Sequence, residues 1–200
     1  MWTIRLRSSS RPVVTSREPA EDADEARGEG GGTETQAKDV CLRLLTTRAR
    51  SRAELDEQLT KRGFTASVRA GTLDRLAAAH LVDDAAFARE WVRSRHLHSG
   101  KGRTAIAIEL RNKGIEEEHA IAALGDLTRD DERGKAAEVV RRKLRSIDAD
   151  EIAGDRAVRD RLARRMVGML ARRGYPQGLA FDVVKEVLAE ARADTEDLFD

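Results

Sequence analysis

The sequence predicts an all-α protein made of tandem three-helix repeats that form an elongated, curved array. Alanine, leucine, glutamate and arginine, all good helix formers, dominate its 200 residues, and the chain has only three prolines. A short phrase also occurs three times, as LTKRGF at 59–64, LRNKGI at 110–115 and LARRGY at 170–175. Each copy follows one apolar helical pattern and precedes another, so the phrase predicts a helix end that recurs in successive repeats.

The repeated phrase has the chemistry of a helix C-terminus. Its cation offsets the negative end of the helix dipole, and its glycine can take the left-handed conformation that residues with a Cβ resist. Gly63 and Gly114 are 51 residues apart, and Gly114 and Gly174 are 60 apart. A repeat of this size has too small a core to be stable alone, so we expect neighbouring repeats to pack on each other.

Composition divides the chain into a basic body between two acidic ends. Residues 37–193 hold 32 Lys and Arg against 25 Asp and Glu. This balance favours a polyanionic partner, although a solvated helical surface without such a partner explains it equally well. We expect a disordered N-terminal tail at 1–36, repeats at 37–80, 81–125 and 126–193, and an acidic C-terminal tail at 194–200.

The first repeat is expected to become ordered near Lys38, where an apolar helical face begins. Ser51 and Glu54 have the spacing of a capping box and predict the start of a second helix, which ends at Gly63. Thr65 is a suitable N-cap for the third helix. The expected apolar positions of the three helices are Val40, Leu44, Leu45, Leu55, Leu59, Val68, Leu73 and Leu76.

The second repeat is predicted to begin with Asp83 as an N-cap. Its first helix carries Phe87, Trp91 and Arg95 at intervals of four, so these side chains lie near one face. The sequence SGKG at 99–102 breaks this helix, and two further helices are expected on either side of the second repeated phrase. Their expected apolar positions are Ile106, Leu110, Ile121 and Leu124.

The third repeat is predicted to begin near Arg129 with a longer helix. A second helix is expected from about Asp155 to Arg172, and Pro176 suits the first turn of a third because its ring presets the backbone for helix entry. The expected apolar positions are Ala136, Val139, Val140, Leu144, Val158, Leu162, Met166, Met169, Leu170, Phe181, Val184, Val187 and Leu188.

No pattern predicts catalysis, a cofactor or a metal. The run GKGRT at 100–104 departs from a phosphate-binding loop, because Arg95 stands where the first glycine should be and no strand precedes it. We expect a turn there that exposes Lys101 and Arg103. The histidines lack a carboxylate at ligand spacing, and Cys41, the only cysteine, is expected in the core. Surface or capping roles are expected for His80, His96, His98 and His119.

A stripe of four arginines is the strongest candidate for a binding surface. Arg161, Arg164, Arg165 and Arg172 fall within about a third of the circumference of their predicted helix. Like charges four residues apart repel unless a partner neutralises them, whereas dipole compensation and solvation explain many other cations. The candidate partner-binding residues are Lys101, Arg103, Arg111, Lys113, Arg161, Arg164, Arg165 and Arg172.

Several short motifs occur in a specific order along the chain. They are RARS at 48–51 before EL at 54–55, GF at 63–64, DAAFA at 84–88 before WV at 91–92 and Arg95, GKG at 100–102, and ELRNKGI at 109–115. This ordered set resembles the RecX family of bacterial recombination regulators. The resemblance covers residues 38–190, is strongest in the middle repeat and is weakest at 125–160, and the long N-terminal segment lies outside it.

The resemblance implies tandem three-helix units and a modulator of the RecA recombinase that has no enzymatic activity and no cofactor. Members of this family bind along the groove of the RecA filament on single-stranded DNA. They suppress its ATP hydrolysis, strand exchange and coprotease activity, and no catalytic residue is carried over to this chain. We therefore expect a monomer whose partner is this filament, with weak direct DNA binding as a further interaction.

Two other classes of protein fit parts of the sequence. Short helices joined at a glycine also suit a helix-turn-helix DNA-binding regulator, although no helix shows the clustered Arg, Asn and Gln that read base edges. A scaffold solenoid is the third class, but it needs no basic surface. No apolar run approaches the length of a membrane span, and the start of the chain lacks the apolar core of a signal peptide. We expect a cytoplasmic protein that does not bind a membrane.

Overall fold

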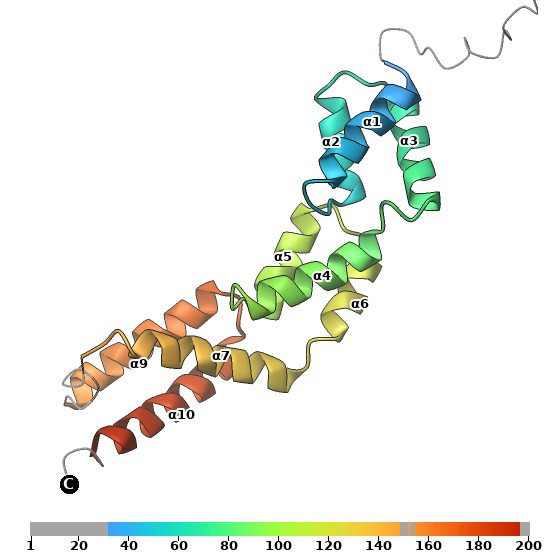
Figure 1. Ribbon diagram of the computed structural model, residues 1–200. Coiled ribbons are helices and arrows are strands. Elements are labelled where there is room, and N and C mark those ends of the chain that lie inside the picture. Colours follow the sequence, from blue (N-terminus) through green and yellow to red (C-terminus); the bar gives the residue numbers. More distant parts are fainter. Residues whose placement is uncertain (1–31, 149–151, 153–154, 197–200) are drawn as a thin grey trace, which may run out of the picture.

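The computed structural model describes residues 32–148, 152 and 155–196. These residues form helices and no strand (Figure 1), which confirms the predicted all-α class. The helices are α1 (Glu34–Leu45), α2 (Arg52–Thr60), α3 (Ala66–Ala78), α4 (Asp84–Leu97), α5 (Arg103–Asn112), α6 (Glu117–Gly125), α7 (Arg129–Leu144), α9 (Arg156–Arg172) and α10 (Gln177–Glu196).

The helices form three bundles that follow one another along an elongated, bent molecule (Figure 1). Helices α1 to α3 make the first bundle, α4 to α6 the second, and α7, α9 and α10 the third. Each bundle has its own apolar core, around Leu55 and Leu59 in the first, Ile106 and Leu110 in the second, and Leu170 in the third. The tandem three-helix architecture that the repeated phrase predicts is therefore confirmed.

Three helices begin at the N-caps predicted from the sequence, and α9 begins at Asp155, near its predicted start. The Ser51 side chain accepts a hydrogen bond from the amide of Glu54 in a complete capping box at the start of α2. Thr65, Asp83 and Asp155 cap α3, α4 and α9 with their side chains. Each cap supplies an acceptor for an amide that has no partner within its own helix.

Helices extend into both segments that the sequence assigns to tails, 1–36 and 194–200. Thr33 and Gln36 form a capping box that starts α1 at Glu34, ahead of the predicted start near Lys38. The predicted start rests on the apolar face, which begins one turn after the capping box. Helix α10 continues to Glu196, so the predicted acidic tail begins as helix, and residues 1–31 and 197–200 lie outside the described residues.

The three repeated phrases end α2, α5 and α9 in the same way. Gly63, Gly114 and Gly174 have φ angles of 82°, 69° and 84°, the left-handed conformation predicted for them. After each glycine, the next amide donates to the carbonyl five residues earlier, as Phe64 does to Leu59. The apolar residue therefore folds back on the last turn of the helix, as expected.

Two predicted core residues are exposed instead. Ile121 on α6 is 63% exposed and Phe181 on α10 is 60% exposed. Each lies three residues before a core residue, Leu124 in α6 and Val184 in α10. In both helices, the buried face extends from this core residue to the side of the helix away from Ile121 or Phe181. In a short helix, the apolar pattern does not determine which side of its apolar stripe the bundle buries. The prediction that these two residues lie in the core was therefore wrong.

The repeats are joined by end-to-end contacts between their middle helices, α2, α5 and α9. At the first joint, Ser51 Oγ at the start of α2 donates to the carbonyl of Lys113 at the end of α5 (2.6 Å). The amide of Arg52 donates to Asp84 at the start of α4 (2.8 Å). A Cβ added to Gly114 would collide with the Cβ of Ala53 in α2, so close approach as well as φ requires this glycine.

The second joint has the same arrangement. At the start of α5, the amide of Gly102 donates to the carbonyl of Arg173 at the end of α9 (2.8 Å). The amide of Arg103 donates to Glu132 of α7 (2.8 Å), which corresponds to the bond from Arg52 to Asp84 at the first joint. In both cases a carboxylate from the next repeat accepts from the first turn of a middle helix.

The two joints place α9, α5 and α2 end to end, and we refer to these three helices as the column. At the second joint a Cβ on Gly174 would collide with the backbone of Ala105 in α5, as a Cβ on Gly114 does at the first. The negative end of one helix dipole faces the positive end of the next at each joint, so this stacking is electrostatically favourable. Gly63 ends the column, with no described atom within 4 Å of an added Cβ.

Candidate partner-binding surface

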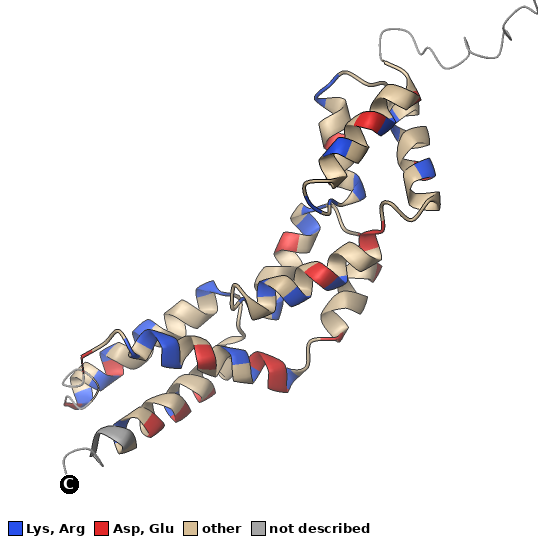
Figure 2. Cartoon of the chain, viewed as in Figure 1, with Lys and Arg blue, Asp and Glu red and all other residues tan. Residues whose placement is uncertain are grey.

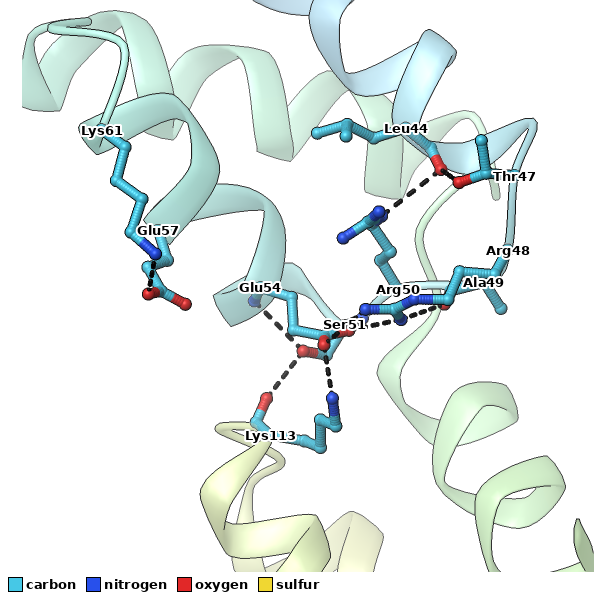
Figure 3. Close-up of polar contacts among 10 residues, drawn as sticks. All are labelled: Leu44, Thr47, Arg48, Ala49, Arg50, Ser51, Glu54, Glu57, Lys61 and Lys113. Carbon is cyan, nitrogen blue, oxygen red and sulfur yellow. Dashed lines mark hydrogen bonds and ion pairs between the residues drawn. The ribbon is translucent and has the colours of Figure 1, made fainter.

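An ion network centred on Glu54 holds the first joint together, with Glu54 and Ser51 of α2 facing Lys113 (Figure 3). The Glu54 carboxylate accepts hydrogen bonds from both Nη atoms of Arg48, at 2.9 and 3.0 Å, and pairs with Lys113 Nζ at 2.5 Å. Burial alone would raise the pKa of this carboxyl, but the hydrogen bonds and charges of Arg48 and Lys113 lower its pKa to about 2. Lys113, a predicted binding residue, is thus a structural link between two repeats.

Lys113 also contacts an aromatic cluster in the second repeat. Its Nζ lies 4.9 Å from the centre of the Trp91 ring, and the Arg95 guanidinium lies 4.2 Å from it, distances at which the ring attracts a cation. Phe87 stacks on Trp91 with ring centres 5.5 Å apart, and the Trp91 indole nitrogen donates to Glu109 of α5 (2.9 Å). The predicted face of Phe87, Trp91 and Arg95 is confirmed, and it packs α4 against α5.

Lys101 and Arg103 are likewise tied into the fold. Lys101 pairs with Glu109, whose pKa is lowered because the hydrogen bond and charge of Lys101 outweigh the effect of burial. Arg103 pairs with Glu132 at 3.5 Å, and Glu132 is only 5% exposed. The predicted turn is present and leaves the Lys101 and Arg103 side chains 36% and 41% exposed, but each is also held by a carboxylate of the fold. The buried Glu132 needs a cation beside it, so Arg103 has a structural role in addition to its exposure.

The turn at 100–104 does not offer the free amides of a phosphate-binding loop. The amides of Gly102 and Thr104 donate to carbonyls at the end of α9, and the amide of Arg103 donates to Glu132. A phosphate site at a helix N-terminus needs such amides to face the anion. This geometry agrees with the prediction that the run GKGRT is not a nucleotide site.

His96 differs from its prediction, and Cys41 agrees with it. His96 is 5% exposed and its Nδ1 lies 3.1 Å from the carbonyl of Lys101, so it closes the turn between α4 and α5 from inside the repeat. Cys41 is buried in the first core. In the ranges that the structure describes, no group of His, Cys, Asp and Glu could hold a metal ion, and no helix has the length and apolar character to cross a membrane.

The other five predicted binding residues are exposed. Arg111 lies near the end of α5. We call four exposed arginines in the middle and at the end of α9 the basic face: Arg161, Arg164, Arg165 and Arg172. Within the described part of the chain, no hydrogen bond or ion pair engages the side chains of Arg111, Arg161, Arg164 or Arg172. These cations are available to solvent or to a partner, unlike the three that hold the joints.

The basic face occupies the outer side of α9. Leu162, Met166 and Leu170 point from the opposite side of this helix into the core of the third repeat. Figure 2 shows Lys and Arg along α9 and α7, and Asp and Glu at the start of α7 and along α10. One side of the third repeat is therefore basic.

The cations of α7 are partly neutralised within the repeat. Arg133 pairs with Glu186 of α10, and Arg141 pairs with Glu190 of the same helix at 2.7 Å. Helix α10 thus compensates part of the charge of α7, and the basic face of α9 is a separate concentration of positive charge in the repeat. Such a cluster attracts polyanions and raises the rate at which they bind.

Two protein-family models match the chain. The model described as "RecX, first three-helix domain" matches residues 37–76, and "RecX, second three-helix domain" matches residues 83–124. Regulatory protein RecX of Mycolicibacterium smegmatis is 51% identical over 186 residues, which cover 92% of this chain and 97% of that protein. Regulatory protein RecX of Mycolicibacterium vanbaalenii is 49% identical over 181 residues, which cover 90% and 95%.

Solved structures share the fold. The crystal structure of RecX from Lactobacillus salivarius has a TM-score of 0.63 at 20% sequence identity, and the match covers 80% of this chain and 97% of that chain. A crystal structure described as regulatory protein RecX has a TM-score of 0.64 at 21% identity, with 76% and 73% covered. At this level of identity, the likeness concerns the arrangement of the helices.

Proposed function

This chain belongs to the RecX family, and from that premise we propose that it regulates the RecA recombinase without catalysing a reaction itself. Its target is the RecA filament on single-stranded DNA. Binding inhibits ATP hydrolysis, strand exchange and the coprotease activity of RecA. The proposal places this activity in the cytoplasm.

The basic face is the observation that carries the proposal. Arg161, Arg164 and Arg172 lie on the outer side of one helix, and none of them has a counter-charge among the described residues. Neighbouring arginines repel one another in water. A polyanion relieves this repulsion, and it gains further because bound counterions are released. The filament supplies such a partner in its DNA phosphates and in acidic protein surface.

The elongated shape supports binding along a filament groove. The two joints hold the three repeats in a fixed order through hydrogen bonds, ion pairs and close glycine contacts. One molecule can therefore touch several protein subunits at once, and linked contacts strengthen one another. We expect inhibition at fewer than one molecule for each RecA subunit.

Weak direct binding to DNA is a second proposed activity, and the same arginines would contact the phosphates. Binding of this kind falls steeply as salt is raised. Since no helix was found to carry the clustered Arg, Asn and Gln that read base edges, it should show no sequence preference.

The test is ATP hydrolysis by RecA on single-stranded DNA, measured with increasing amounts of this protein. We expect inhibition at substoichiometric ratios, under conditions where binding to the same DNA without RecA is much weaker. Unchanged hydrolysis at equimolar protein would contradict the proposal. Inhibition that only follows the coverage of bare DNA would assign the effect to competition for DNA.

A further inference from the structure

The column has a receiving end at Gly63 that resembles the two internal joints but has no partner among the described residues. Gly63 has the same left-handed φ as Gly114 and Gly174. At those two glycines an added Cβ would collide with Ala53 and Ala105 at the start of the next middle helix, whereas at Gly63 it would meet nothing within 4 Å. The helix end is thus built like the others, but none of the described residues covers it.

The carbonyl before this glycine is also unused. At the internal joints the residue before the glycine is a cation whose carbonyl accepts a hydrogen bond, from Ser51 to Lys113 and from Gly102 to Arg173. Arg62 stands at this position in α2, and we find no donor to its carbonyl in the described part of the chain. A helix end of this kind gains from an N-terminus that supplies donors.

The other end of the column carries a first turn that matches. Helix α2, which enters the first joint, begins Ser51-Arg52-Ala53, and α9 begins Asp155-Arg156-Ala157. Both have a capping side chain, then an arginine, then the alanine that faces the glycine at the first joint. The Asp155 carboxylate cannot donate as the Ser51 hydroxyl does, so the donor at this position would be the Asp155 amide, as the Gly102 amide is at the second joint. Ala157 is exposed, so its surface is free for the same contact.

The remaining parts of the joint are present at the receiving end. Helix α4 begins with Asp84, which accepts from the amide of Arg52 at the first joint, and α1 begins with Glu34 at the equivalent position. The Glu34 carboxylate pairs with Arg75 through one oxygen at 2.5 Å, and its other oxygen can offer the same acceptor to the amide of Arg156. The receiving end carries Lys61 and Arg62, and the entering end carries the exposed Asp155 beside the exposed Arg156. Asp155 therefore supplies the charge complementary to the receiving end, as Arg156 occupies the place that Arg52 has at the first joint.

We propose that the receiving end of one molecule, around Gly63, binds the first turn of α9 of a second copy of this chain. The two surfaces differ, so the contact is heterologous and can continue into a head-to-tail chain of molecules rather than close a dimer. The internal joints benefit from covalent linkage, so the contact between molecules is weaker and forms as concentration rises. This inference replaces the expectation of a monomer and does not depend on the proposed function.

Site-specific cross-linking tests the geometry. Arg62→Cys and Ala157→Cys proteins are purified separately, mixed, and treated with a short bismaleimide, while the native Cys41 is buried and protected. We expect a covalent dimer in the mixture and little in either protein alone, because two like ends do not fit each other. The control mixture pairs Arg89→Cys of α4 with Lys185→Cys of α10, both exposed and outside the two proposed contact surfaces. Equal cross-linking in the control, or strong dimers of either single variant, would overturn the proposal.

Sedimentation velocity tests the assembly itself. We expect the average mass of the wild-type protein to rise from micromolar to about millimolar concentration. Gly63→Asn should remain monomeric with little change in melting temperature, because Asn tolerates the left-handed conformation while its side chain covers the receiving end. Gly178→Asn, which also adds a side chain in open space, should associate like wild type. A monomeric wild type, or Gly63→Asn that associates equally, would overturn the proposal.

Discussion

Glycine is required for different physical reasons at the free end of the column and at its two joints. At Gly63 only the left-handed backbone requires it. At Gly114 and Gly174 the neighbouring helix also occupies the place where a Cβ would lie. The same substitution should therefore have unequal effects at positions that look identical in the repeated phrase.

A pair of alanine substitutions measures this difference. Gly63→Ala should lower the free energy of unfolding by about 1 kcal/mol, the cost of a left-handed residue with a Cβ. Gly174→Ala should lose this amount and about 1–3 kcal/mol more, because its methyl group is forced into Ala105. Urea unfolding followed by circular dichroism gives both values. Equal losses would show that α5 can move away from α9 at no cost.

His80 is the reverse case, a residue with a Cβ at a helix end that suits glycine. It is exposed, has a φ of 55° and ends α3 with the hydrogen-bond pattern of the glycine ends. His80→Gly should raise the free energy of unfolding by about 0.5–1 kcal/mol, because relief of strain exceeds the added freedom of the unfolded chain. The same urea titration checks this value, and a loss of stability would mean that the imidazole makes a stabilising contact.

Glu54 links the first joint to pH. Its pKa is lowered from 4.5 to about 2 in the folded protein, so the unfolded chain binds its proton more tightly. The carboxylate therefore adds stability that is fully present above pH 4.5 and is lost as pH falls through about 2. The stability of wild type over Glu54→Gln should be constant from pH 7 to near pH 4.5 and then shrink. An advantage that stays constant down to pH 2 would contradict this role.

At the scale of elements, arginines on one helix have separate roles. Arg103 begins α5 and connects it to Glu132 of α7, whereas Arg111 near its end has no partner among the described residues. Charge and helix position alone do not separate these two roles. Burial of the partner carboxylate does.

Matched substitutions on α5 test this distinction. Arg103→Met should lower the free energy of unfolding by about 1–3 kcal/mol, because it leaves the buried Glu132 without its cation. Arg111→Met keeps the same change in charge and size and should alter stability by less than about 0.5 kcal/mol. Thermal and urea unfolding of the two variants give the comparison. Similar losses would mean that the Glu132 carboxylate is adequately solvated without Arg103.

Helix ends could be predicted because local rules govern them. Ser51, Thr65 and Asp83 cap the helices that the sequence assigns to them, and the glycine ends follow from three adjacent residue types. The burial of α6 and α10 was harder to predict, since Ile121 and Phe181 lie on the flank that the bundle leaves uncovered.

The candidate site could be predicted only where it depends on the spacing of residues within one helix. The basic face follows from the spacing of arginines along α9, and its exposure agrees with the prediction. Lys101, Arg103 and Lys113 look like free cations in the sequence, but each has a carboxylate partner in the structure. The side chain of Lys101 bonds a carboxylate 8 residues away, the amide of Arg103 one 29 residues away, and the side chain of Lys113 one 59 residues away. Contacts between repeats are set by tertiary packing, which no single motif encodes.

At the scale of the whole molecule, the column explains how small bundles act as one elongated unit. Each bundle has a modest core, and each joint adds hydrogen bonds, charge pairing and a glycine contact across the boundary. Stability is therefore shared between neighbours, as in other repeat proteins. The basic face lies on the third unit of this array, so it can bind while the other two units extend along the same partner.

Inhibition of RecA by a variant of the basic face tests the central claim most directly. The variant changes Arg161, Arg164 and Arg165 to Glu, and the control changes three exposed cations on other helices, Lys38, Arg129 and Lys185, to Glu. Both alter the charge equally, and both should keep the helical circular dichroism of wild type. ATP hydrolysis by RecA on single-stranded DNA is measured with each protein at two salt concentrations.

We predict that the control inhibits nearly as well as wild type, whereas the basic-face variant loses most inhibition and its remaining effect depends less on salt. Wild-type inhibition by a correctly folded basic-face variant would contradict the claim and would assign these arginines to ordinary solvation.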